Sequence, residues 1–314
     1  MVANSSKISL GVCQRKLLFV SLFVAVLLVS CMMVVGAKDS SLEDVIYVSS
    51  EAELNAAVKN ATPGVPVVIA LDRDITLTDN ALIINNNKDI TLTSNKTSGF
   101  YQLIGTVKNM RMYTISVSYG GVLKLDGVIV THARGYSGTG ILVSNGSTLI
   151  MVEGEISNNW GGVHNNGHFI MYGGKISNNK NTYAHISSVT FAGGYGGGVN
   201  NEGKFEMFGG EITNNTADKN GGGIHNTGTF TMYGGKISDN TADTIGGGIH
   251  NTGTFKKRGG EIINNTAPEG NNIYSPENNS WPSMVSICVS IVFVCGIVGG
   301  FYFYESKKRK NHKG

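Results

Sequence analysis

The feature that most constrains this chain is a motif that returns five times between Gly140 and Asn272. Its core is Gly-Gly-[Lys/Glu]-Ile, shortened in the first copy, and its isoleucines are Ile156, Ile176, Ile212, Ile237 and Ile262. They lie 20, 36, 25 and 25 residues apart, so the basic unit has 25 residues and the longest step contains an insertion. Such a period is typical of stacked units that bury their apolar faces only against one another.

Within one unit the apolar residues alternate as they do in β-strands. Phe230 and Met232 alternate with Thr231 and Tyr233, and no run of ten residues has helical spacing. Glycines separate these short runs and supply corners at which a positive φ costs little. The repeat therefore predicts an all-β fold, a parallel β-helix (β-solenoid) with about 25 residues per coil.

In a parallel β-helix, equivalent residues of successive coils lie above one another, so like residues should form columns. The expected columns are Phe169, Phe205, Phe230 and Phe255; Asn165, Asn201, Asn226 and Asn251; and Asn159, Asn179, Asn215, Asn240 and Asn265. A charged column alternates in sign and reads Glu155, Lys175, Glu211, Lys236 and Glu261. Opposite charges on neighbouring strands stabilise a sheet and like charges destabilise it, so the alternation favours direct stacking.

The N-terminus is typical of a secretory signal peptide, which we assign to residues 1–37. Arg15 and Lys16 precede an apolar run, and small residues before Lys38 offer a cleavage site. The run is long enough that an uncleaved anchor is the alternative. A lipobox-like Leu28–Cys31 is disfavoured, because the residues after Cys31 are unusually apolar.

The C-terminus is typical of a membrane anchor. Residues 284–304 carry no charge and are long enough to span a bilayer, with residues 276–283 as a stalk. The basic residues 305–314 predict a cytoplasmic tail by the positive-inside rule, which places the repeat outside the cell. We therefore expect a single-pass protein of the cell membrane.

Composition excludes several classes of partner and site. The four cysteines, Cys13, Cys31, Cys288 and Cys295, all lie in the terminal segments, so the region between them has no disulfide or cysteine-bound metal. The net charge is +3, and much of this excess lies in the last ten residues. No basic face for nucleic acid is therefore expected, and neither a cofactor nor a particular oligomeric state is predicted.

Residues 38–139 lack the repeat but contain short β-branched runs, which predict irregular first coils before the repeat at 140–275. Ser50–Glu53 is a capping box, and Leu54, Ala57 and Val58 follow at helical spacing. A short helix here would cover the open first coil, whose strand edges would otherwise face water. A helix that binds a partner is the alternative.

These N-terminal residues carry a family resemblance. After the strand and helix, Ile69–Thr78 and Asp89–Ser94 resemble the opening of pectate-lyase-like, right-handed parallel β-helix proteins. The motifs Gly222-Gly-Ile224 and Ile237-Ser-Asp-Asn240 resemble repeats of polymorphic membrane proteins and adhesin-like surface proteins. The resemblance covers roughly residues 45–275 and implies a right-handed solenoid, display at the cell surface and adhesion. It is specific for fold and not for ligand.

Carboxylates that could catalyse a reaction are scarce in the repeat. Enzymes of this fold need an acidic cluster for calcium or paired aspartates, whereas Asp218, Asp239 and Asp243 are not adjacent. Asp72-Arg73-Asp74 comes nearest to a catalytic group, with both carboxylates on one face of a strand, although a turn is favoured there. We therefore predict a non-catalytic protein. The alternatives are a polysaccharide lyase or hydrolase and a structural component of a surface layer.

A histidine column is the nearest approach to a metal site. His164, His225 and His250 align in one column, which Asn200 interrupts. His225 and His250 should lie one strand spacing apart, but zinc needs three or four ligands and no carboxylate joins them. We therefore expect stacked, exposed histidines and no metal.

Two sets of aromatic residues are candidate contacts for an extracellular glycan or surface protein. The first set is an outward column of Tyr172, Phe208 and Tyr233, which offers rings on a flat β face. The second lies in the insertion Asn181–Tyr195 and consists of Tyr183, His185, Phe191 and Tyr195. Loops on a rigid scaffold often carry recognition, so the insertion is the segment expected to set specificity.

Sequons predict glycosylation on the exposed part of the chain. Their asparagines are Asn60, Asn95, Asn145, Asn214, Asn264 and Asn278. If Asn215 and Asn265 point into the core, their neighbours Asn214 and Asn264 point outward, as the attachment of a glycan requires.

Overall fold

The fold was analysed in a computed structural model of the chain, in which residues 45–276 are described. Within this range residues 79–80, 96–98, 107–111, 136–137, 183–184, 187–188 and 191–192 are left out, as are the side chains of 185–186 and 189–190. The predicted signal peptide, membrane span and tail lie outside the described residues. Among the described residues, no helix is long and apolar enough to cross a bilayer.

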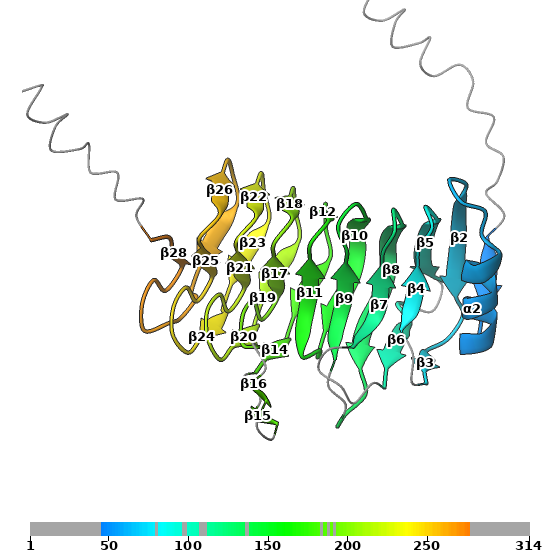
Figure 1. Cartoon of the computed structure of the whole chain (residues 1–314), viewed down its shortest axis with the longest axis horizontal. Coiled ribbons are helices and arrows are strands. Elements are labelled where there is room, and N and C mark those ends of the chain that lie inside the picture. Colours follow the sequence, from blue (N-terminus) through cyan, green and yellow to red (C-terminus); the bar gives the residue numbers. More distant parts are fainter. Residues whose placement is uncertain are drawn as a thin grey trace, which may run out of the picture. The chain divides into compact units, whose positions relative to one another are not determined.

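The described residues form stacked parallel β-sheets with one short helix at the N-terminal end (Figure 1). The architecture is that of a parallel β-helix, as the repeat predicts. Among the described residues, every member of the main hydrophobic cluster lies between Val48 and Ile249, and Phe255 and Ile262 pack against it, so residues 45–276 contain this cluster. The predicted boundary at 139/140 falls within strand β9 (Thr139–Val143), so it marks a change in sequence regularity and not a break in the sheets.

The largest sheet has fifteen strands in two limbs. The longest strands, β8 (Val122–His132) and β10 (Thr148–Ser157), run through both limbs, and each contains a glycine with positive φ, Gly127 and Gly154, at the bend. One limb adds β1 (Ile46–Val48), β2 (Pro66–Leu71), β5 (Asp89–Ser94), β12 (His168–Met171), β18 (Lys204–Met207), β22 (Thr229–Met232) and β26 (Thr254–Lys257). The other limb adds β3 (Ile75–Leu77), β6 (Gln102–Gly105), β13 (Lys175–Ser177), β19 (Glu211–Thr213), β23 (Lys236–Ser238) and β27 (Glu261–Ile263).

Three smaller sheets complete the coils. An eight-stranded sheet contains β9 together with β4 (Leu82–Ile84), β7 (Tyr113–Val117), β11 (Gly161–Asn165), β17 (Val199–Asn201), β21 (Ile224–Asn226), β25 (Ile249–Asn251) and β28 (Ile273–Tyr274). A three-stranded sheet consists of β14 (Lys180–Asn181), β20 (Thr216–Ala217) and β24 (Thr241–Ala242). The insertion forms an antiparallel hairpin of β15 (His185–Ile186) and β16 (Val189–Thr190), which projects from one side of the coils (Figure 1).

The predicted phenylalanine column stacks in register through the core. Phe169, Phe205, Phe230 and Phe255 pair in successive strands, with ring centroids 4.5, 4.7 and 5.1 Å apart. The first three rings are fully buried. Parallel pairing of equivalent residues is therefore confirmed across a 36-residue step as well as the 25-residue steps.

The predicted asparagine columns form two buried hydrogen-bonded ladders. In one, each side-chain amide donates to the side-chain oxygen of the next coil at 2.9–3.0 Å, from Asn159 through Asn265. The same amides also donate to backbone carbonyls, as Asn215 does to Ile176 at 2.9 Å. In the other ladder Asn165, Asn201, Asn226 and Asn251 are linked at 2.6–2.7 Å. Buried amides cost little when their polar atoms are paired, and identical neighbours supply most of these bonds in both ladders. The exception is the side-chain oxygen of Asn165, at the start of the second ladder, which has no hydrogen-bond partner among the described residues.

The charged column is in register as predicted. Glu155, Lys175, Glu211, Lys236 and Glu261 pair in sequence along the coils. None of these neighbours forms a close ion pair among the described residues, so their attraction acts across solvent and is weak. The hydrogen-bonded and apolar columns therefore hold the coils in register.

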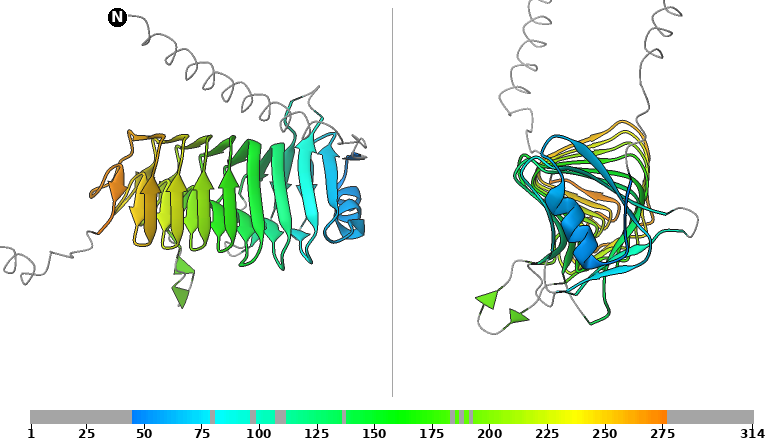
Figure 2. Two further views of the ribbon diagram at one scale, coloured as in Figure 1. Left: turned by 90° about the horizontal axis from the view of Figure 1, so that it is seen from above. Right: turned by 90° about the vertical axis from the view of Figure 1, so that its right-hand side faces the viewer.

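The predicted helix, α2 (Glu51–Asn60), lies across the N-terminal end of the coils (Figure 2). Its N-cap Ser50 accepts a hydrogen bond from the Glu53 amide at 3.2 Å, while the Glu53 carboxylate accepts from the Ser49 amide at 2.7 Å. Leu54 and Val58 are buried against the first coil. At the other end of the helix the Lys88 ammonium donates to the Val58 carbonyl at 2.8 Å. The helix therefore closes the core at this end.

We expect Asn215→Ala to lower the free energy of unfolding by about 3 kcal/mol, because it removes bonds to two neighbouring coils and leaves buried partners unpaired. Urea denaturation of residues 45–276 measures this change. Asn214→Gly is the matched control, because Asn214 is exposed with a φ of 55° that glycine adopts freely. Equal losses in the two variants would contradict a stabilising role for the ladder.

Candidate functional site

The outward aromatic column crosses three successive coils. Tyr172, Phe208 and Tyr233 are 53%, 42% and 42% exposed. Their ring centroids are 5.2 and 4.6 Å apart, and the rings are inclined by 21° and 4°. The column lies outside because Met171, Met207 and Met232, one residue earlier in each coil, point into the core. We call these three residues the aromatic strip.

The stacking decides what the aromatic strip offers to a ligand. Because successive rings are parallel, the faces of Phe208 lie against its two neighbours. Solvent therefore meets mainly ring edges and the tyrosine hydroxyls, where the sequence alone suggested open ring faces. A continuous, narrow apolar strip of this kind fits an extended chain better than a single compact ligand.

A charged cluster lies beside the aromatic strip. The Glu206 carboxylate, two residues before Phe208, is 2.6 Å from the Lys204 ammonium and 2.7 Å from Nε2 of His168. The pKa of Glu206 is held below its ordinary value mainly by the hydrogen bond from Lys204, and the hydrogen bond from His168 adds to this effect. Glu206 is therefore a paired anion, suited to accept hydrogen bonds and poorly suited to carry a proton.

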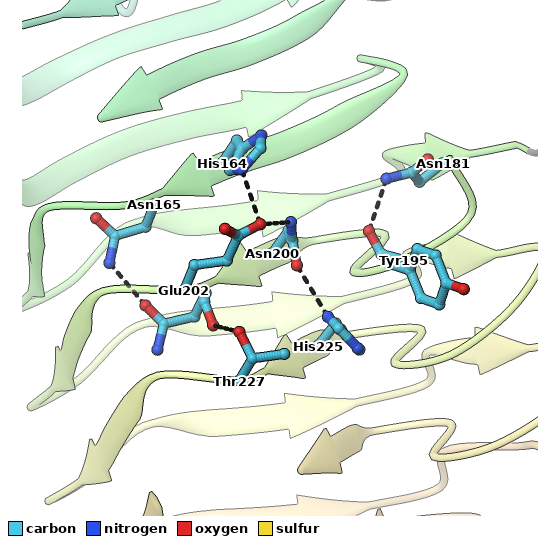
Figure 3. Close-up of polar contacts among 9 residues, drawn as sticks. His164, Asn165, Asn181, Tyr195, Asn200, Glu202, His225 and Thr227 are labelled. Carbon is cyan, nitrogen blue, oxygen red and sulfur yellow. Dashed lines mark hydrogen bonds and ion pairs between the residues drawn. The ribbon is translucent and has the colours of Figure 1, made fainter. Parts of the chain in front are cut away.

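A polar network covers the outward face of the eight-stranded sheet (Figure 3). Glu202 lies 3.3 Å from Nε2 of His164 and accepts from the Asn200 amide at 3.2 Å. The Asn200 oxygen lies 2.9 Å from Nδ1 of His225. Since this oxygen only accepts, Nδ1 of His225 carries the proton, and Nε2 is the unprotonated nitrogen of the neutral ring.

The histidines continue into a mixed ladder of stacked rings. The His225 and His250 rings are 5.0 Å apart and inclined by 6°, with Tyr195 5.0 Å from His225 and Tyr274 5.5 Å from His250. The expectation of exposed histidines is therefore wrong, since His250 is buried and His225 is half-buried. Burial, and then repulsion from His250, lowers the pKa of His225 to about 4. Burial also lowers the pKa of His250.

The stacked geometry opposes a shared metal ion. Two zinc–nitrogen bonds of about 2.1 Å can join nitrogens that are at most about 4.2 Å apart. The stacked His225 and His250 rings have their centroids 5.0 Å apart, which is longer than this span. Among the described residues, no group of three or more histidines, cysteines and carboxylates could hold a metal ion.

The insertion is fastened at its base. The Asn181 amide donates to the Tyr195 carbonyl at 2.7 Å, and the Gly194 amide donates to the Asn181 oxygen at 2.8 Å. The Trp160 indole donates to the Thr182 hydroxyl at 2.9 Å. The Tyr195 ring therefore meets His225 and joins the insertion to the histidine face. Tyr183, Phe191 and the side chain of His185 lie outside the described residues.

The predicted sequons differ in exposure. Asn60, Asn145, Asn214 and Asn264 are exposed, and Asn278 lies outside the described residues. Asn95 is half-buried, and its amide donates to the Asp72 carboxylate at 3.3 Å. Asn215 and Asn265 are buried beside their exposed neighbours, as expected from the alternation.

Asp72, Arg73 and Asp74 lie in a turn between β2 and β3 and not on a strand face. Asp74 accepts a hydrogen bond from the Gln102 amide at 2.8 Å, which is the turn role that the sequence favoured. Two hollows of about 430 and 630 Å³ occur among the described residues, one beside α2 and one near Arg134, and neither is lined by two carboxylates.

Sequence reasoning missed the residues that surround the two aromatic surfaces. Glu202 and Glu206 were not singled out, although each lies two residues from a column residue on the same side of its strand. Tyr195 was assigned to a free loop, but it lies 25 residues before Asn220 and so occupies a repeat position. Alignment of the end of the insertion with later copies would have given Tyr195 a position in the repeat, although not the direction of its ring.

Comparisons of the chain with models of known protein families, with characterised proteins and with solved structures find no match. The site is therefore interpreted from its own geometry.

The lowered pKa values predict that acid destabilises the solenoid. Between pH 6.5 and pH 4 the unfolded chain protonates His225, whereas the folded chain keeps it neutral. The folded state therefore loses stability relative to the unfolded state as pH falls from about 6.5 toward 4. For His225 we expect a loss on the order of 2–3 kcal/mol between pH 7 and pH 4. His225→Asn should reduce this loss in urea denaturation at both pH values. Thr227→Asn, at the exposed residue just after the same strand, should keep it, and identical pH dependence in both variants would contradict the assignment.

Proposed function

We propose that this chain is a non-catalytic surface protein, anchored in the cell membrane by residues 284–304. In this proposal its parallel β-helix is of the right-handed, pectate-lyase-like kind and acts as an adhesin-like module. It binds extended glycans or other surface molecules outside the cell. The observation that carries the proposal is the aromatic strip, which lies exposed on a rigid sheet.

The rigidity of the scaffold supports binding at the aromatic strip. Phe208 is held between two rings, and Tyr172 and Tyr233 each stack on Phe208, so little side-chain freedom is lost when a ligand docks. Tyrosine combines an apolar ring with a hydroxyl that can donate and accept hydrogen bonds, a combination suited to sugars. Lys204, Glu206 and His168 add charged partners beside the apolar rings. Together these groups could contact a glycan chain, which carries polar groups and whose sugar rings have apolar faces.

The chemistry beside the strip favours binding over turnover. The only carboxylate that we find in this cluster, Glu206, is held as an anion by Lys204 and His168. A glycosidase needs one carboxyl that holds a proton and a second that does not. A polysaccharide lyase or hydrolase, and a surface-layer component, are the alternatives to binding. Cleavage of acidic polysaccharides or ordered self-assembly by the purified protein would identify them.

Display outside the cell is supported by the exposed sequons. Asn60, Asn145, Asn214 and Asn264 lie on the surface of the coils, where glycosylation would not disturb the core. Under this proposal the predicted signal peptide and membrane span place these sequons outside the cell.

The test of binding is a glycan array probed with residues 45–276. We expect selective retention of extended glycans, with at least tenfold weaker binding by the triple variant Tyr172→Ser, Phe208→Ser, Tyr233→Ser, because rings at binding sites each contribute about 1 kcal/mol or more. The matched control replaces three other exposed aromatic residues, Tyr47, Phe100 and Tyr119, by serine. Equal losses in the two variants, or binding that neither variant changes, would rule out the aromatic strip as the contact.

A further inference from the structure

The last coil departs from its neighbour in one short run. Where the coil before reads Thr231-Met232-Tyr233, the last coil reads Lys256-Lys257-Arg258, between the same Thr-Phe and Gly-Gly flanks. The register pairs Thr231 with Lys256 and Met232 with Lys257. Three consecutive cations therefore replace an outward, an inward and an outward residue of the repeat. We call these three residues the basic run.

The basic run is free to meet an external anion. Lys256, Lys257 and Arg258 are all exposed, and no carboxylate among the described residues forms an ion pair with them. The two carboxylates of the last coil lie elsewhere. Glu261 belongs to β27, in register with Lys236, and Glu269 forms a bridge to Ile245 on another side of the coil.

In the part of the chain that the structure describes, the end that carries the basic run is open. Strands β26, β27 and β28 each pair with a strand on one side only, whereas α2 covers the first coil. Phe255 and Ile262 are only partly buried there, and Ile263 and Ile273 are 37% and 39% exposed. This end therefore combines exposed apolar side chains with three neighbouring positive charges.

The need to protect the exposed strand edge explains Lys257 but not the other two residues of the basic run. Lys257 occupies the position at which Met232 enters the core, so its charge alone prevents a further coil from stacking there. Lys256 continues the column of Thr231, and Arg258 follows Lys257 as Tyr233 follows Met232, so neither replaces a residue of the core. Protection of the strand edge therefore does not explain their positive charge, which would be explained by an anionic partner outside the chain.

The chain leaves the solenoid at this same end. After Tyr274, the nine residues 275–283 can span at most about 30 Å before the uncharged run 284–304 begins. We propose that the open end, through the basic run and the exposed isoleucines Ile263 and Ile273 of the same coil, docks on anionic phospholipid headgroups of the membrane. Basic residues beside a membrane anchor are attracted to such lipids, and exposed aliphatic side chains can enter the interface.

A second copy of the chain fits this surface less well. End-to-end stacking of two open ends would bring two basic runs together, and like charges across an interface oppose association. The partner that the charge favours is an anionic surface.

The experiment measures cosedimentation of residues 45–276 with vesicles. This segment contains the main hydrophobic cluster and lacks the predicted span, so any binding reports the surface itself. Vesicles of phosphatidylglycerol and phosphatidylcholine should bind it at low salt, and high salt or pure phosphatidylcholine should abolish the binding. The triple variant Lys256→Gln, Lys257→Gln, Arg258→Gln should bind about 100-fold more weakly, since each cation contributes roughly a factor of five.

The matched control removes three exposed cations that lie far from the basic run in sequence. The variant Lys59→Gln, Arg73→Gln, Lys180→Gln has the same net charge as the first variant and should bind like the native segment. Equal losses in the two variants would overturn the proposal, as would binding to neutral vesicles that salt does not weaken. Dimers in analytical ultracentrifugation, without vesicle binding, would assign the end to a second copy. Because glycan binding is measured separately, failure here leaves the proposed function of the aromatic strip untouched.

Discussion

The whole structure depends on one constraint, which is that each residue must pair with its own equivalent in the next coil. The asparagine ladders show this most directly, because each inward amide along the ladder bonds to the amide of the same column in the next coil. A slip by one residue would leave the amides unpaired and turn the phenylalanine column away from the core. The repetition in the sequence is thus the means by which each coil specifies its neighbour.

The same constraint divides the molecule into an interior and an exterior with different freedoms. Inward columns hold one residue type over several coils, as the phenylalanines and methionines do. Outward columns change type freely, as in the order His164, Asn200, His225, His250 and Tyr274. The outward surface can therefore vary without disturbing the core, as in the aromatic strip and at Lys256 of the basic run, whereas Lys257 replaces an inward residue only where no further coil of the described chain follows.

The inward columns could be predicted from the sequence because spacing alone defines them. The strands β6 and β7 were missed, since Gln102–Gly105 and Tyr113–Val117 precede the regular repeat and have no equivalent at a fixed spacing. The burial of His225 and His250 was also missed. It arises from Tyr195, at the end of the insertion, and Tyr274, in the last strand, and repeat alignment does not place their rings against the column. Contacts between outward side chains depend on rotamers, which a repeat pattern does not determine.

The insertion shows what this architecture permits. Asn179 bonds to Asn215 across 36 residues in the same way that Asn215 bonds to Asn240 across 25. The ladder therefore depends on which positions pair and not on the number of residues between them in the sequence. The Asn181 side chain bonds to Gly194 and Tyr195 and so joins the two ends of the insertion. The segment between these ends can therefore be exchanged without changing the coils. New specificities can then arise by replacing a loop while the scaffold is inherited unchanged.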